Sequence, residues 1–222
     1  MKKILVIAPH PDDETLGCGG TLLKHIAAGD EVHWMIVTAI STAIGFTAER
    51  VSQRDLEIEK VNLFYGFSGV HQAGFPTMRL DRVEKLQLIE SVASVVRKTQ
   101  PDTLYIPYRN DAHSDHAAVF DAAVACTKSF RYPSVRSVYT YETLSETEFG
   151  LRTDDPGFRP NRLVDISNWL EQKISIMHMF DGEIAAFPFP RSETCMRAQA
   201  ALRGSQANVM AAEAFMVLKE IR

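Results

Sequence analysis

Short apolar runs alternate with longer amphipathic stretches along the whole chain. Residues 4–8, 32–38 and 103–107 are apolar runs rich in branched side chains, with the length of strands that are buried on both faces. Further strands are predicted at 135–141 and 162–166. Apolar positions at helical spacing predict helices at 15–28, 48–64, 86–98, 116–128 and 169–180. This alternation favours a Rossmann-like α/β fold, in which helices on both sides cover a mostly parallel sheet.

Composition narrows the class of protein. The chain has 222 residues, 45% hydrophobic and 23% charged, with no repeat or composition break, so we expect a single domain over residues 1–222. A net charge of −4 without a basic run argues against a nucleic-acid surface. No apolar stretch has the length of a membrane span. The cysteines form no CxxC pair and are expected to be free thiols, which is typical of a cytoplasmic protein.

Two polar segments follow predicted strands directly. PHPDDE (9–14) comes after the first strand, and NDAHSDH (110–116) comes after the strand at 103–107. Taken alone, the acids of the first segment suit the first turn of a helix, and the HxxH of the second suits local hydrogen bonding. In a parallel sheet, however, the carboxyl ends of strands share one edge, where ligands bind.

Brought together, the two segments predict a metal site. One carboxylate and two imidazoles make a set of three ligands with open positions, the pattern of catalytic zinc. A further carboxylate beside such a set can take a proton from water, and a spare histidine can stabilise an oxyanion or protonate a leaving group.

The segments PHPDDETLGCGG (9–20) and DAHSDH (111–116) resemble the two metal motifs of the PIG-L-type, or LmbE-like, zinc-dependent N-deacetylases. The family has Ala where this chain has Pro9, a position that carries no ligand. Weaker similarity continues at Arg54 and Glu57, at Arg203-Gly204 and at 212–215.

The resemblance implies one zinc ion per chain, with iron(II) as an alternative because imidazole and carboxylate accept both metals. The implied ligands are His10, Asp13 and His116. Asp12 is implied to be the general base that activates the zinc-bound water, and His113 to stabilise the oxyanion together with the zinc. Asp115 is implied to orient a histidine from outside the ligand set, and Asp111 is a second candidate for that role.

The implied reaction removes an N-acetyl group from an amino sugar of the GlcNAc type or its conjugate, a small-molecule partner. Arg54, Arg109 and Asp111 are candidate substrate contacts, since arginine suits phosphate or carboxylate. Specificity is expected in the loops at 39–47, 74–82 and 185–192.

Other interpretations stay open at this stage. A zinc amidase acting on a non-sugar or thiol-conjugate amide would use the same residues. A phosphoesterase often uses two metals, whereas only one set of three ligands is visible here. A non-catalytic binding protein would have a degenerate metal site or none, whereas every candidate ligand and the base are present. Gly17, Gly19 and Gly20 do not complete a dinucleotide fingerprint, because Leu22 stands at its last glycine; they are expected to let a helix pack closely. The phenylalanines at 187 and 189 could belong to an interface between copies of the chain, so a homo-oligomer is possible.

Overall fold

A seven-stranded sheet crosses the molecule in the order β3-β2-β1-β4-β5-β7-β6. The computed structural model describes residues 1–151 and 153–221, so residues 152 and 222 of the expected domain lie outside the described residues. The strands are β1 (Lys3–Ala8), β2 (Glu31–Ala39), β3 (Gly69–Pro76), β4 (Thr103–Pro107), β5 (Ser137–Tyr141), β6 (Arg162–Asp165) and β7 (Ala212–Glu220). Neighbours from β3 to β5 pair in parallel, while β7 is antiparallel to both β5 and β6. The predicted α/β fold with a mostly parallel sheet is confirmed.

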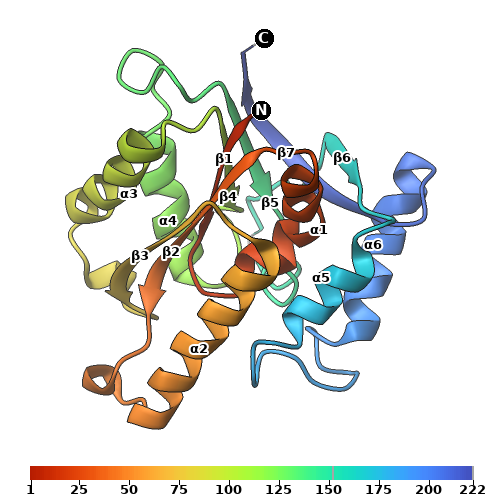
Figure 1. The fold of residues 1–222 in the computed structure, drawn as a ribbon, viewed down its shortest axis with the longest axis horizontal. Coiled ribbons are helices and arrows are strands. Elements are labelled where there is room, and N and C mark those ends of the chain that lie inside the picture. Colours follow the sequence, from red (N-terminus) through yellow and green to blue (C-terminus); the bar gives the residue numbers. More distant parts are fainter. Residues whose placement is uncertain (152, 222) are drawn as a thin grey trace.

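Helices cover both faces of this sheet (Figure 1). They are α1 (Asp13–Ala27), α2 (Ala48–Tyr65), α3 (Lys85–Thr99), α4 (Ser114–Ala125), α5 (Leu170–Met177) and α6 (Glu193–Ala207), with short 3-10 turns η1 (Thr42–Ile44) and η2 (Leu80–Arg82). In β1, Ile4 and Val6 pack with α1 and α2 on one face, and Leu5 and Ile7 pack with α3 and α4 on the other. This division explains why the central strands are continuously apolar.

Three elements lie outside the predicted set. The periodicity of the sequence predicted neither the strands β3 and β7 nor the helix α6. In addition, α4 ends at Ala125 rather than continuing to residue 128. β3 is an edge strand that is half exposed and contains two glycines, so it lacks the apolar run of a central strand. No helix in the described part of the chain combines the length and apolar character that crossing a membrane requires.

Helix α1 begins beside the HPDD turn and packs unusually close to the sheet. A Cβ on Gly17 would collide with the ring of Tyr141, and one on Gly20 would collide with Ile166. The Tyr141 hydroxyl in turn donates to the carbonyl of Ile7, at 2.9 Å. The glycines therefore serve close helix packing, as predicted, and they fix the start of α1 against β1 and β5.

Candidate metal and active site

The two polar segments meet at the carboxyl ends of β1 and β4, which are direct neighbours in the sheet. The chain moves from β1 outward to β2 and β3 and then returns to β4, so the strand order reverses between β1 and β4. Such a reversal opens a crevice at the strand ends, because the connections leave on opposite faces. The HPDD turn is held there by Thr38, whose amide and hydroxyl both donate to the Pro9 carbonyl.

His10, Asp13 and His116 come together in this crevice. Asp13 Oδ2 lies 3.2 Å from His10 Nδ1 and 3.4 Å from His116 Nε2. One potential ligand atom from each of the three residues lies within 4.8 Å of the others. Asp13 and His116 are buried, and His10 is partly exposed. Two imidazoles and one carboxylate that converge with one side open form a donor set that suits zinc or iron(II).

The atoms behind these three residues also fit a bound metal. His116 Nδ1 lies 2.7 Å from Asp111 Oδ2, and its other ring nitrogen is buried without a hydrogen-bond partner in the described structure. His10 Nε2 lies 3.1 Å from Asp115 Oδ2, which leaves Nδ1 toward Asp13. A carboxylate on the far nitrogen of each imidazole fixes the ring and its tautomer, as in known metal sites.

Charge in the cluster favours a cation. Burial alone would lower the pKa of His10, but hydrogen bonds with Asp115 and Asp13 raise it to about 9. The carboxylates thus outweigh desolvation at this ring. A metal ion would satisfy the same negative environment.

His113 stands beside the three residues and faces the crevice. Its Nδ1 accepts a hydrogen bond from the Asp115 amide at 3.1 Å, which places the proton of the neutral ring on Nε2. Burial, with a further contribution from nearby His10, lowers the pKa of His113 to about 4. His113 is therefore a neutral donor near pH 7, suited to a developing negative charge on a substrate oxygen.

Asp12 is the acid that faces the crevice beside Asp13. Its backbone φ is +138°, a conformation that favours glycine, so the turn is strained at this residue. Burial raises the pKa of Asp12 to about 7, although nearby Arg191 acts in the opposite direction. A carboxyl group with a pKa near neutrality suits general acid–base chemistry.

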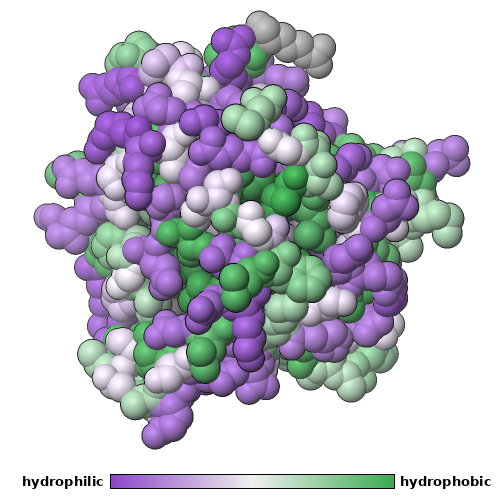
Figure 2. Space-filling view, in the orientation of Figure 1, coloured by the Kyte–Doolittle hydropathy of each residue, from purple (hydrophilic) through white to green (hydrophobic). Residues whose placement is uncertain are grey.

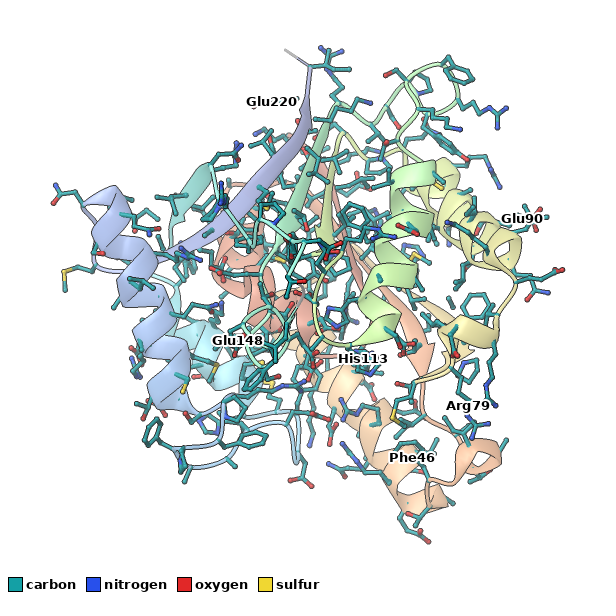
Figure 3. The ribbon with its side chains drawn as sticks, turned by 180° about the vertical axis from the view of Figure 1, so that it is seen from behind. Phe46, Arg79, Glu90, His113, Glu148 and Glu220 are labelled. Atoms are coloured by element: carbon teal, nitrogen blue, oxygen red, sulfur yellow. The ribbon has the colours of Figure 1, made fainter. Side chains whose placement is uncertain are left out.

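A cavity of about 260 Å³ opens from this cluster. His10, Asp12 and His113 line its inner end, and its walls come from the loop after β2, from α2, from Thr77 and Met78, and from Arg191. Figure 3 shows His113 near the centre of the molecule and Phe46, which also lines the cavity, toward one end, with Glu220 at the opposite end. Each of the three predicted specificity loops contributes residues to this wall.

The structure places the predicted substrate contacts differently with respect to the cavity. Arg109 does not line the cavity; its Nε donates to Asp121 at 2.7 Å on the surface of α4. Asp111 is buried between His116 and the hydroxyl of Thr147, so it supports a potential ligand instead of contacting substrate.

Arg54 does line the cavity, but its guanidinium is already engaged. It donates to the Pro11 carbonyl at 2.9 Å and pairs with Glu57 and Glu183. These contacts help to hold the HPDD turn, and the predicted contact of Arg54 with substrate stays a prediction. Asp115, which was predicted to orient a histidine, lies behind His10. Its carboxylate accepts hydrogen bonds from the amides of Met78 and Leu80.

Sequence reasoning missed Glu146, Glu183 and Arg191. All three line the cavity, and Arg191 Nη1 lies 2.8 Å from Asp12 Oδ2. They come from the long connections that follow β5 and α5, in which no motif or periodicity singles them out. The nearest feature of the sequence that could have pointed to Arg191 is the proline-rich segment before α6.

Comparison with known proteins gives a family match and similar folds. Residues 5–127 match the family model described as PIG-L: GlcNAc-PI de-N-acetylase. The diacetylchitobiose deacetylase of Thermococcus kodakarensis is 26% identical over 202 residues, which cover 82% of this chain and 70% of that protein.

Among solved structures, N,N'-diacetylchitobiose deacetylase from Pyrococcus horikoshii has a TM-score of 0.78 at 22% identity, covering 98% of this chain and 84% of that one. GalB, the 4-carboxy-2-hydroxymuconate hydratase of Pseudomonas putida KT2440, has a TM-score of 0.74 at 20% identity, covering 100% and 98%. These two likenesses show the fold, and they also show that one fold serves two different reactions.

Proposed function

This chain belongs to the PIG-L family, and from that premise we propose that it is a metal-dependent N-deacetylase acting on an N-acetylated amino sugar or its conjugate. The observation that carries the proposal is the grouping of His10, Asp13 and His116 beside a cavity that His10, Asp12 and His113 line. The likeness to the diacetylchitobiose deacetylase of Thermococcus kodakarensis supports the proposal.

The metal would be held by His10, Asp13 and His116, with zinc as the first candidate and iron(II) as the second. When bound, it supplies Lewis-acid polarisation of the amide carbonyl and makes water more acidic. Asp111 and Asp115 keep the two imidazoles in the orientation that this role requires.

The remaining steps use the side chains around the cavity. Asp12 accepts a proton from water as the water oxygen bonds to the acetyl carbon. The Nε2 proton of His113 forms a hydrogen bond with the carbonyl oxygen as that oxygen becomes negative. Asp12 then returns the proton to the amide nitrogen as the carbon–nitrogen bond breaks. The products are acetate and the free amino sugar.

The charges of the cavity favour a neutral sugar over a phosphorylated one. Its three lining arginines, Arg50, Arg54 and Arg191, are each paired with carboxylates. Asp55 also lines the cavity, is exposed, and has no hydrogen bond or ion pair in the described structure. A phosphate would therefore meet an unpaired negative charge and no free guanidinium on the cavity wall.

Acetate release tests the proposal directly. The panel contains N-acetylglucosamine, diacetylchitobiose, N-acetylglucosamine 6-phosphate and UDP-N-acetylglucosamine, each with zinc-loaded, iron-loaded and chelator-treated protein. We expect chelator-sensitive release, highest for the neutral sugars. Protein that holds one metal ion per chain and releases no acetate from the panel or from other N-acetylated sugar conjugates would contradict a sugar deacetylase and favour another amidase.

Asp12→Asn provides the mechanistic test. Because asparagine cannot accept the proton, kcat should fall by about 100-fold or more while the bound metal stays unchanged. Arg109→Ala is the matched control, since Arg109 lies outside the cavity, and it should retain wild-type kcat. An Asp12→Asn variant with full turnover would remove Asp12 as the base.

A further inference from the structure

Arg191 reaches the centre of the proposed active site from a distant part of the chain. It lies in the connection between α5 and α6, and its side chain is 17% exposed. Its Nη1 donates to Asp12 Oδ2 at 2.8 Å. This is the single hydrogen bond that the described structure gives to the Asp12 carboxylate.

Three other groups fix the Arg191 guanidinium. Nε donates to the Ser145 hydroxyl at 2.6 Å, Nη1 to Glu183 Oε2 at 2.9 Å, and Nη2 to Glu146 Oε1 at 3.4 Å. These partners come from the segment after β5 and from the segment after α5. With its donors directed at neighbours on several sides, the planar guanidinium is held in one place.

Asp12 depends on such support. Its backbone is held in a strained conformation at a φ of +138°, and the residue lines the cavity. Without a partner, a carboxylate on so short a side chain could turn to either of its other staggered rotamers. The hydrogen bond from Arg191 occupies Oδ2 and leaves Oδ1 without a protein partner.

We propose that Arg191 is a positioning residue that holds the Asp12 carboxylate in the orientation needed to accept the proton from water. This inference rests on the proposed function, in which Asp12 is the base. It also separates Arg191 from a substrate-binding arginine, because its donors are committed to Asp12, Glu183, Glu146 and Ser145.

The test compares Arg191→Met and Arg191→Lys with wild type on the best substrate of the acetate-release panel. Misorientation of a base lowers the rate of the chemical step, so we expect Arg191→Met to lower kcat by about 10- to 100-fold with KM within about threefold. Bound metal should stay unchanged. Arg191→Lys should recover part of kcat, because an ammonium can still reach Asp12.

A double variant separates positioning from a general structural role. If Arg191 acts through Asp12, adding Arg191→Met to Asp12→Asn should cause no further loss of kcat. The matched control is Arg197→Met, which removes an arginine from the adjacent helix α6 that pairs with Glu171 outside the cavity. This control should leave kcat and KM at wild-type values.

Two kinetic outcomes would overturn the inference. A rise in KM at unchanged kcat would make Arg191 a substrate contact, and a further loss in the Asp12→Asn background would show that it acts elsewhere. If Arg191→Met does not fold, Arg191→Lys carries the same comparison.

Wild-type protein that releases no acetate would refute the proposed function separately. Crystal structures of wild type and Arg191→Met, which lacks any donor to Asp12, would then decide the positioning claim. A displaced Asp12 carboxylate in the variant supports it, and an unmoved one refutes it.

Discussion

Asp55 is a charged residue whose environment predicts a change in substrate preference. It lines the cavity without a partner in the described structure, so its carboxylate should repel a phosphate on the substrate. Two unit charges about 4 Å apart in water interact by about 1 kcal/mol, which corresponds to about fivefold in rate. We therefore expect Asp55→Asn to raise kcat/KM for N-acetylglucosamine 6-phosphate about fivefold relative to N-acetylglucosamine.

The matched control for this measurement is Glu59→Gln, which removes an exposed acid of the same helix outside the cavity. Its ratio of kcat/KM values should equal that of wild type. An Asp55→Asn ratio that also stays at the wild-type value would show that the substrate phosphate does not approach this wall.

Asp111 predicts a different kind of defect. Its Oδ2 lies 2.7 Å from His116 Nδ1, and both side chains are buried. Removing the negative charge weakens the hold on the ring and lowers the basicity of its other nitrogen. We expect Asp111→Asn to weaken metal affinity by about 10- to 100-fold, measured by competition with a chelator of known affinity. Asp121→Asn, on the exposed side of α4, should retain the affinity of wild type, and equal affinities in both variants would argue against metal binding by His116.

At the residue scale, the sequence predicted the cluster better than its surroundings. His10, Asp13 and His116 could be placed together because each belongs to a polar segment that follows a recognisable strand. Glu183 and Arg191 could not, since they sit in irregular connections whose path depends on tertiary packing. Arg109 lies outside the cavity, because its closeness in sequence to the second motif does not determine where its side chain points.

Helix α1 is the element with the most unusual support. Its regular geometry breaks at Cys18, and the amides of Gly20 and Thr21 donate to the Glu213 carboxylate of β7 at 2.9 and 2.7 Å. Lys173 of α5 donates to the same carboxylate at 2.7 Å. The break thus leaves buried amides without their helical acceptors, and the buried Glu213 carboxylate accepts their hydrogen bonds instead.

This arrangement predicts a strong loss of stability when Glu213 is replaced. Glu213→Leu would leave buried Lys173 without a carboxylate and two amides without an acceptor, so we expect a loss of about 3–5 kcal/mol in the free energy of unfolding. Denaturant titration measures it. The double variant Glu213→Leu, Lys173→Met should recover part of that loss, because the uncompensated charge is gone. If the free energy of unfolding of Glu213→Leu lies within about 0.5 kcal/mol of the wild-type value, as for a typical surface substitution, the role of this ion pair is refuted.

The elements that periodicity missed share a physical cause. α6 buries Met196, Ala200 and Gly204, so small residues replace the large apolar side chains that mark a helix stripe. β7 lies between β5 and β6 and has an exposed end, which breaks its apolar pattern. The central strands were predicted well because burial on both faces leaves a simple signal.

At the scale of the whole molecule, the α/β class and the edge of the sheet that holds the site could be predicted from the sequence. The antiparallel insertion of β7 between β5 and β6 could not, because strand order depends on contacts far apart in the chain. The surface of the molecule carries both apolar and polar residues. Figure 2 shows apolar residues among polar ones on the face over α2, a helix whose Leu56, Leu63 and Phe64 are exposed.

The position of the candidate ligands predicts that metal binding stabilises the whole fold. His10 and Asp13 follow β1, whereas His116 lies about a hundred residues later in α4, so one ion would join two distant segments. Binding to the folded state at about 1,000 times Kd adds about 4 kcal/mol of stability. For a chain of this size, each 1 kcal/mol shifts Tm by about 2–4 °C, so chelation should lower Tm by about 8–16 °C.

Thermal unfolding with chelator, and again after zinc or iron is added back, measures this shift. His116→Ala provides the matched control, because removing one of three ligands should abolish the response of Tm to chelator while leaving the other segment intact. A Tm that responds equally in both proteins would place the ion elsewhere. A reversible shift confined to the wild type would show that the residues proposed to carry out catalysis also hold β1 and α4 together, so that loss of metal would weaken activity and stability at once.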